Sequence, residues 1–106
     1  MVNQSVDAVL QALGDPSRRQ IVERLAASPR PVMDLARPLA MSLPAVLRHL
    51  SVLEKSGLVT SRKVGRVRTC QLEPDAFRAL EGWIVTQRTT WENRLDDLGE
   101  FLDGRE

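Results

Sequence analysis

Apolar residues recur at helical spacing along much of this 106-residue chain, and the clearest case lies between residues 42 and 55. On a helical projection at about 100° per residue, apolar side chains gather on one side and small or basic side chains on the other. The apolar side holds Leu43, Val46, Leu47, Leu50 and Leu53, and the other side holds Pro44, Ala45, Arg48 and Ser51, with His49 on the flank. Ser42 is placed to cap this helix and Gly57 to end it.

Two further helices are predicted near the N-terminus. Ser5 is expected to cap the first helix, and Gly14 to end it by adopting a left-handed conformation. Asp15 is expected to cap the second helix, with Pro16 at the first helical position, where its missing N–H group costs nothing. The apolar stripe of the first helix contains Val6, Val9, Leu10 and Leu13, and the buried face of the second is expected to contain Ile21, Val22 and Leu25.

A third, short helix is predicted over about residues 32–37, because Pro38 disfavours helical structure at the residue before it. Residues 39–41 then form a tight connection to the helix at 42–55. Two short helices joined by about four residues are typical of a helix-turn-helix unit.

A β-hairpin is predicted directly after this unit. Residues 58–64 and 67–72 are rich in Val, Thr and Arg and indicate two strands, and Gly65-Arg66 supplies the turn between them. The hairpin contains four basic residues and no acidic residue: Arg62, Lys63, Arg66 and Arg68. A hairpin in this position is the "wing" of a winged helix-turn-helix domain.

The last predicted helix begins with Asp75 as its cap and runs to about residue 102. At 1.5 Å per residue its roughly 28 residues span ~42 Å, which is longer than packing within a small domain requires. Its apolar residues Phe77, Ile84, Trp91 and Leu98 recur every seven residues, and Leu95 and Leu102 form a second line offset by four. A seven-residue apolar repeat predicts a seam between two helices.

Together these elements predict one domain over residues 1–106, because the length suits one small domain and neither a linker nor an internal repeat interrupts it. The predicted fold is mainly α with a small β-hairpin. It is a winged helix-turn-helix with a long C-terminal helix, about residues 75–102, that serves dimerisation.

The charge distribution adds a candidate partner. Residues 42–72 hold six basic residues and one acidic residue, a net charge of +5, whereas residues 73–106 have a net charge of −5 and residues 1–41 a net charge of +1. A basic middle segment favours binding to a polyanion. Aromatic residues make up only 4% of the chain, which argues against a stacking surface for single-stranded nucleic acid.

A helix that can enter a groove, beside a basic hairpin that can lie on phosphates, is what binding to double-stranded DNA requires. Arg48 is the candidate to read a base edge, because its planar guanidinium matches guanine O6 and N7. Ser42, the amides of the first helical turn and His49 are candidates to hold phosphates. The candidate DNA contacts are Ser42, Leu43, Pro44, Ala45, Arg48 and His49 on the helix, and Arg62, Lys63, Arg66 and Arg68 on the wing.

Five segments carry a resemblance to a known family. Residues 15–21, Asp-Pro-Ser-Arg-Arg-Gln-Ile, resemble the opening of ArsR-type winged-helix repressors, and residues 41–50 resemble their recognition helix. Residues 53–59 are similar to the stretch that enters the wing in that family, and Gly65-Arg66 matches its wing tip. The segment 91–95, Trp-Glu-Asn-Arg-Leu, is similar to one in the last helix of the SdpR-like, non-metal branch of the family.

This resemblance implies a homodimeric repressor that binds a near-palindromic operator and acts by promoter occlusion. It also implies that the first and last helices form the dimer interface, for which the candidate residues are Val6, Leu10, Ile84, Trp91, Leu95 and Leu98.

Metal sensing is not expected. Metal-sensing members of the family carry a Cys-x-Cys pair where this chain has Pro31 and Met33, and the whole chain contains one Cys and one His. Neither a metal nor another cofactor is therefore expected. Cys70 has two interpretations, a redox switch or a small buried apolar residue, and the second is favoured because free cysteines are among the most buried residues.

Other functions have less support. No catalytic constellation stands out, so an enzyme is not expected, and without a secretory signal or an apolar run of ~18 residues a cytoplasmic location without membrane contact is the simplest inference. Two alternatives remain open. In the first, the winged helix docks a protein rather than DNA. In the second, the repressor responds to an unknown effector through Trp83 and Trp91 or through oxidation of Cys70.

Overall fold

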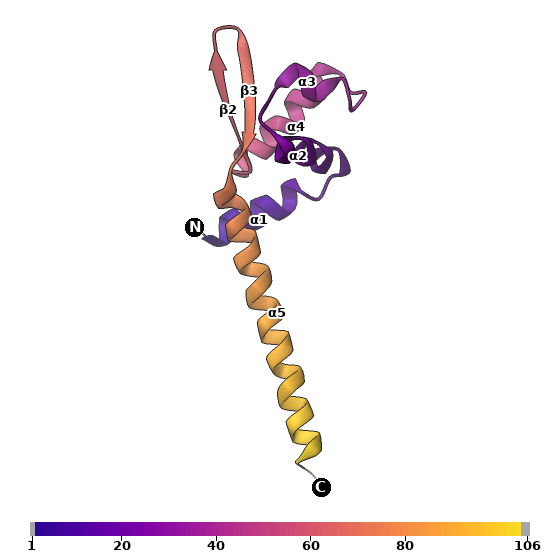
Figure 1. Cartoon of the computed structure of the whole chain (residues 1–106), viewed down its shortest axis with the longest axis vertical. Helices are drawn as coiled ribbons and strands as arrows, with labels where there is room; N and C mark the ends of the chain where they lie inside the picture. Colours follow the sequence, from indigo (N-terminus) through magenta and orange to yellow (C-terminus); the bar gives the residue numbers. More distant parts are fainter. Residues whose placement is uncertain (1, 105–106) are drawn as a thin grey trace.

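The computed structural model describes residues 2–104, with side chains from residue 6 onward. The helices α2, α3 and α4 pack together at one end beside the wing, α1 lies beneath them, and α5 extends away from all of these elements (Figure 1). The molecule is therefore elongated, with extents of 72 × 28 × 20 Å. The helices are α1 (Val2–Ala12), α2 (Pro16–Ala27), α3 (Val32–Ala36), α4 (Leu43–Lys55) and α5 (Pro74–Asp103).

The predicted caps of α2 and α4, and the predicted end of α4, are confirmed. The carboxylate of Asp15 accepts a hydrogen bond from the amide of Arg18 at 3.0 Å, which caps α2. The hydroxyl oxygen of Ser42 accepts one from the amide of Ala45 at 3.3 Å, which caps α4. Gly57 ends α4 with a φ of +85°, a left-handed conformation that glycine adopts without a steric penalty.

The predicted ends of α1 are wrong. The helix begins at Val2, so Ser5 lies inside it and is not its cap. At the other end Gly14 does not have a positive φ, so it is not the predicted left-handed cap. Its N–H group donates to the carbonyl of Gln11 at 3.2 Å in a tight turn. A left-handed cap normally satisfies the last carbonyls of a helix. Here guanidinium groups of α2 satisfy them instead.

The guanidinium groups of Arg18 and Arg19 join α2 to the end of α1. Arg18 donates from Nε to the carbonyl of Ala12 at 2.6 Å and from Nη2 to the carbonyl of Gln11 at 3.2 Å. Arg19 donates from Nη1 to the carbonyl of Leu13 at 2.7 Å. Cations also interact favourably with the negative end of a helix dipole. We call this arrangement the α1–α2 clamp.

The start of α5 also differs from the prediction. Pro74 occupies the first helical position and Glu73 precedes it, so Asp75 is not the cap. Pro74 suits this position because its fixed φ is already helical and it has no N–H group to satisfy. Asp75 instead lies in the first turn and pairs with Arg78 at 2.6 Å.

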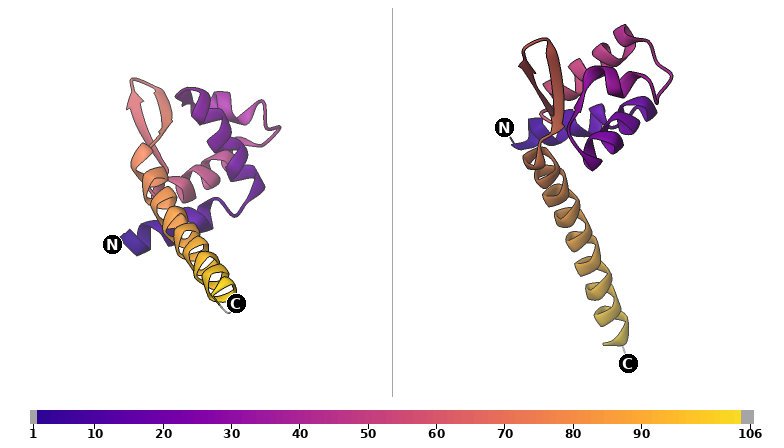
Figure 2. Two further views of the ribbon diagram at one scale, coloured as in Figure 1. Left: turned by 60° about the horizontal axis from the view of Figure 1, so that its bottom comes forward. Right: turned by 45° about the horizontal axis from the view of Figure 1, so that its top comes forward.

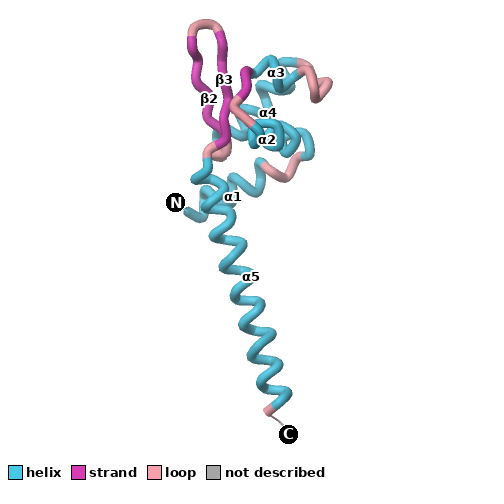
Figure 3. The backbone as a smooth tube through the Cα atoms, in the orientation of Figure 1, coloured by secondary structure: helices cyan, strands magenta, loops and turns pink. Residues whose placement is uncertain are grey.

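The two predicted strands pair with a third strand that the sequence did not reveal. Strands β1 (Arg30–Pro31), β2 (Val59–Val64) and β3 (Val67–Leu72) form an antiparallel sheet in the order β1-β3-β2 (Figure 3). Strand β1 has only two residues, one of which is proline, so it shows neither alternation nor strand propensity. Its pairing of Arg30 with Cys70 attaches the base of the wing to the helical unit.

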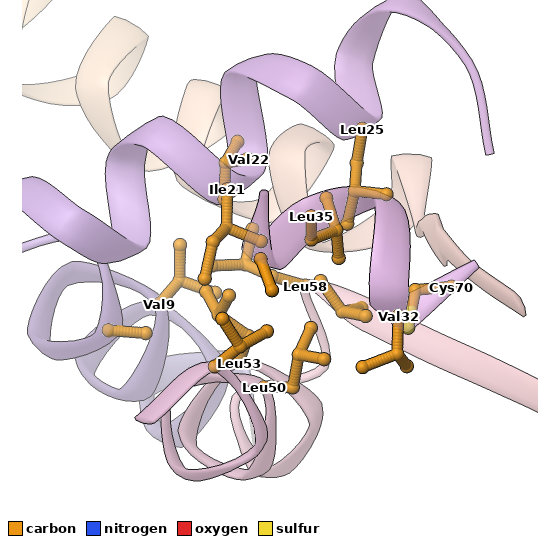
Figure 4. Packing of buried hydrophobic residues seen from close by; sticks show 14 residues of the cluster. Val9, Ile21, Val22, Leu25, Val32, Leu35, Leu50, Leu53, Leu58 and Cys70 are labelled. Carbon is orange, nitrogen blue, oxygen red and sulfur yellow. The ribbon is translucent and has the colours of Figure 1, made fainter. Parts of the chain in front are cut away.

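The core lies between α1, α2, α3, α4 and the base of the wing (Figure 4). Cys70 is completely buried in it, which agrees with its interpretation as a small apolar residue. The predictions for Ile21, Val22 and Leu25 are confirmed. By contrast, Leu10, Leu43 and Leu47, which share the apolar sides of their helices with buried residues, are between 38% and 43% exposed.

The α1–α2 clamp generates a prediction about stability. We expect Arg18→Ala to lower the free energy of unfolding by about 2 kcal/mol, because hydrogen bonds from charged donors contribute roughly 1.5–3 kcal/mol each and this side chain is only partly buried. Urea denaturation followed by circular dichroism measures the change. Gln20→Ala, an exposed position on the same helix, is the control. Equal losses in the two variants would contradict a specific role for the clamp.

Candidate nucleic-acid interface

Helix α4 belongs to the group of helices at the end of the molecule opposite the tip of α5 (Figure 2). It presents small and basic side chains to solvent. Ser42, Pro44 and Arg48 are exposed, while Ala45 and His49 are half-buried. The buried side of the helix holds Val46, Leu50 and Leu53, as predicted. Burial of this side directs Arg48 outward, where its guanidinium is free to meet a base edge.

His49 lies on the flank of α4 that faces the start of α2. Its charge acts on Asp15, the residue that caps α2. The pKa of Asp15 lies below the ordinary value of 3.8, first because its carboxylate accepts the Arg18 amide hydrogen bond, and to a smaller extent through the charges of Arg18 and His49; partial burial opposes this shift. Asp15 and His49 are 34 positions apart in the sequence, so their proximity arises only from the packing of α4 against α2.

The side of α4 that faces the wing is apolar. Leu43 and Leu47 border a groove of about 400 Å³ between α4, α3 and β3. The groove is also lined by Pro31, Val32, Met33, Arg66, Val67 and Arg68. This groove explains why the two leucines are exposed although they share the apolar side of the helix. The wing stands beside them without closing over them.

The strand register determines where each basic side chain of the wing lies. Lys63 is paired with Arg68, so the two share the face of the hairpin that also contains Cys70. Arg62 lies on the opposite face, and Arg66 lies in the turn after Gly65, whose φ is +63°. All four basic side chains are exposed, as a DNA-binding wing requires.

Arg68 differs from the other basic residues of the wing. Its guanidinium pairs with the carboxylate of Glu54 on α4, with 2.6 Å between Nη2 and Oε1. Within the described part of the chain, Arg62, Lys63 and Arg66 form no such ion pair. The hairpin itself contains no acidic residue, but an acidic residue from α4 reaches one of its four cations.

The candidate dimer contacts lie on two adjoining helices, since α1 packs against the first part of α5 (Figure 1). Leu10 is 43% exposed, and Ile84, Trp91, Leu95 and Leu98 are between 46% and 62% exposed. Val6 is buried within the chain and is only 4% exposed. None of the described α5 residues is buried. The apolar stripe of α5 therefore has no cover from its own chain along most of its length.

The described residues offer little for a metal or redox site. No three or more His, Cys, Asp or Glu side chains among them gather in a way that could hold a metal ion. Burial raises the pKa of the Cys70 thiol, an effect that the nearby Arg68 opposes and Glu54 reinforces. The thiolate is the form that binds metals and attacks oxidants. Burial and a raised pKa therefore both disfavour the redox interpretation of Cys70.

None of the helices in the described part of the chain combines the length and the hydropathy that crossing a bilayer requires.

Comparison with known sequences gives a family match. Residues 15–61 match the family described as "Bacterial regulatory protein, arsR family". The HTH-type transcriptional regulator Rv2034 of Mycobacterium tuberculosis is 49% identical, over 93% of this chain and 90% of that protein. The transcriptional repressor SdpR of Bacillus subtilis is 23% identical, over 82% of this chain and 97% of that protein.

Solved structures show the same architecture. The ArsR family transcriptional regulator RHA00566 has a TM-score of 0.79 and 41% identity, over 85% of this chain and 93% of that protein. The homodimeric winged helix-turn-helix DNA-binding domain of Mb0332 from Mycobacterium bovis has a TM-score of 0.66 and 28% identity, over 84% of this chain and 83% of that domain. These likenesses confirm the predicted winged helix-turn-helix fold.

The lowered pKa of Asp15 generates a prediction about acid stability. Its ionised form favours the folded state above the unfolded pKa, and this contribution is lost as the pH falls through the folded pKa. We therefore expect the free energy of unfolding to fall on acidification below about pH 5, and to fall less steeply in Asp15→Asn. Urea denaturation at a series of pH values measures both slopes.

Ser42→Ala is the matched control for Asp15→Asn, because it removes the cap of α4 without removing an ionisable group. It should lower stability by about 1 kcal/mol at every pH. An Asp15→Asn variant as acid-sensitive as the wild type would show that Asp15 does not contribute to the pH dependence.

Proposed function

Because the chain belongs to the arsR family of bacterial regulatory proteins, transcriptional regulators with a winged helix-turn-helix DNA-binding domain, we propose that it is a homodimeric repressor that occludes a promoter. The observation that carries this proposal is the position of exposed Arg48 on α4 beside a wing on which exposed Arg62, Lys63 and Arg66 form no ion pair among the described residues. The name of SdpR, a transcriptional repressor, supports repression as the mode of action. Such a protein acts in the cytoplasm, where bacterial DNA lies.

The proposed contacts divide into those that read sequence and those that hold the DNA backbone. Arg48 reads a base edge in the major groove, and the small side chains of Pro44 and Ala45 allow α4 to approach the bases closely. Ser42, Leu43 and His49 lie beside the backbone, where the first-turn amides of α4 bind phosphate.

The wing supplies contacts that are largely independent of sequence. Arg62, Lys63 and Arg66 are exposed on two faces and at the tip of the hairpin, so they can meet phosphates on either side of a minor groove. Phosphate contacts fix the position of the protein on the duplex, whereas base contacts specify the site. The groove lined by Leu43 and Leu47 lies between these two sets of contacts.

The proposed dimer covers the apolar stripe of α5. A helix of 30 residues without a buried side chain leaves two tryptophans and several aliphatic side chains in water. Burying each such side chain contributes about 1.5–3 kcal/mol, and a second copy of the chain would provide the cover. The homodimeric state of the Mb0332 domain supports this arrangement. In the dimer, two copies of α4 would enter successive major grooves about 34 Å apart on a near-palindromic operator.

The proposed repressor does not sense metals through a thiolate site. Pro31 and Met33 occupy the positions of the Cys-x-Cys pair, and Pro31 takes part in strand β1. Cys70 is buried in the core with a raised pKa, so it does not fit a thiolate ligand set.

Operator preference is the test of the proposed function. We expect the wild type to prefer DNA from its own upstream region to a scrambled duplex by ~10³ or more at about 150 mM salt, as measured by fluorescence anisotropy. Arg48→Ala should lose most of this preference, because the proposed dimer has two Arg48 side chains and each bidentate arginine–guanine contact is worth roughly 1–3 kcal/mol of discrimination, against about 4 kcal/mol for a 10³ preference.

Arg66→Ala is the matched control for Arg48→Ala. It should weaken binding to both duplexes alike and lower the slope of log affinity against log salt by about one. If Arg48→Ala instead weakened both duplexes equally, Arg48 would be a phosphate contact. A wild type that bound the two duplexes equally would contradict operator binding at this site.

Assembly gives a separate prediction. Leu95 is 48% exposed in the single chain, so Leu95→Glu should leave the monomer folded while placing a charge in the proposed dimer seam. We expect light scattering to show a dimer for the wild type and a monomer for the variant, with operator binding lost together with dimerisation. Asn93→Glu adds the same charge on the opposite side of α5 and should remain dimeric. A monomeric wild type would contradict the proposed assembly.

A further inference from the structure

We propose that Glu54, Ser61 and Arg68 form a brace that holds the wing at a fixed angle to helix α4, and that Arg68 is a positioning residue rather than a DNA contact. We call these three side chains the wing brace. The inference rests on the proposed DNA-binding function, because it states how that binding surface is held in place. It also reassigns one of the ten candidate contact residues.

The three side chains connect three different elements: Glu54 lies on α4, Ser61 on β2 and Arg68 on β3. Arg68 donates from Nη2 to Oε1 of Glu54 at 2.6 Å and from Nε to the hydroxyl oxygen of Ser61 at 2.9 Å. The Ser61 hydroxyl in turn donates to the same Glu54 oxygen at 2.9 Å. Each member therefore contacts both others, and neither strand can move relative to α4 without breaking a charge-assisted hydrogen bond.

The location of the brace suits this role. Ser61 is paired with Cys70, which is buried, and Lys63 is paired with Arg68, which is exposed. The brace thus lies where the hairpin leaves the core. Beyond it, Val64 and Val67 are 66% and 50% exposed. An isolated two-stranded ribbon is only marginally stable and twists easily, so the orientation of the tip depends on how its base is held.

A second anchor holds the opposite face of the hairpin but does not connect it to α4. Thr60 donates to the carboxylate of Glu73 at 2.6 Å, and Gln71 donates to the same oxygen at 3.4 Å. These bonds connect the base of the wing to the start of α5. Among the side-chain hydrogen bonds of the described residues, those that join the wing to α4 belong to the brace.

Two features make Arg68 a poor phosphate ligand. Its charge is already balanced by Glu54, which is itself only 27% exposed, and two of its donors are occupied. Glu54 also has an effect on the strand pair itself. Lys63 faces Arg68 across the hairpin, and directly opposed like charges destabilise a strand pair. Glu54 offsets this repulsion and leaves Lys63 available to DNA.

The brace requires an arginine at position 68. Its guanidinium uses one nitrogen for Ser61 and another for Glu54, whereas a lysine ammonium is a single point charge that cannot reproduce this fork. For a simple phosphate contact the charge matters most, and lysine replaces arginine well. Arg68→Lys therefore separates the two roles.

The test measures operator affinity by fluorescence anisotropy between about 50 and 200 mM salt for Glu54→Gln, Arg68→Lys, Arg68→Gln and the double variant Glu54→Gln/Arg68→Gln. We expect each to bind about tenfold more weakly than the wild type, the equivalent of one charge-assisted hydrogen bond. The double variant should bind no more weakly than either single variant, because both changes break the same brace. The salt slope should stay at the wild-type value in all four.

Arg66 provides the matched comparison at the wing tip. Arg66→Gln should lower the salt slope by about one, and Arg66→Lys should keep the wild-type slope, because that residue is proposed to contact phosphate directly. Hydrogen exchange of the DNA-free protein gives a readout that does not depend on DNA. Amides of residues 62–69 should exchange faster in Glu54→Gln than in the wild type, with α1 and α2 unchanged.

The opposite results would overturn the brace. If Arg68 contacts DNA, Arg68→Lys will bind like the wild type, Arg68→Gln will lower the salt slope, and Glu54→Gln will bind more tightly because it frees Arg68. Failure of the proposed function would look different, because the wild type itself would show no operator preference. In that case the hydrogen exchange of Glu54→Gln alone would decide whether the brace holds the wing.

Discussion

The hydrogen bonds between α2 and the last carbonyls of α1 are the constraint on which the rest of the molecule depends. Asp15 caps α2, and in the same segment Arg18 and Arg19 reach back to the carbonyls of residues 11–13. Helix α1 packs both on α5 and on the core, so it lies between the proposed dimer contacts and the helix-turn-helix unit. In the proposed dimer, a fixed joint at this point would allow the dimer geometry to set the separation of the two copies of α4.

The base of the wing is held by two kinds of contact, one made by a buried side chain and the other by charged side chains. Burial of Cys70 and its pairing with Ser61 fix the register at the base of the hairpin. A shift of one residue would turn every side chain of β3 to the other face. The register thus decides that Arg68 faces Glu54 on α4 and that Arg62 faces away. The basic residues of the wing have the same charge, but the strand register determines which of them faces α4 and which faces away.

Helix α5 is the part of the fold that the single chain leaves incomplete. Its first part packs on α1 and, through Phe77 and Leu80, on the core, while Ile84, Trp91, Leu95 and Leu98 face water. Isolated helices gain little stability from propensity alone, and most of their stability comes from packing an apolar face. The same stripe that makes the helix amphipathic is therefore the surface that a second subunit covers in the proposed dimer.

Local chemistry in the sequence determined α2, α4 and the two wing strands, because caps at Asp15 and Ser42, the left-handed Gly57 and Gly65 and the apolar periodicity all act within a few residues. Other features depend on segments that are distant in the sequence and meet only in the fold. These are the pairing of β1 with β3, the exposure of Leu43 and Leu47 in a groove, and the partners of Arg18 and Arg68. A basic residue in a sequence shows its charge but not which carboxylate or carbonyl the packing will place beside it. Tertiary structure decided that, and with it which cations remain free for DNA.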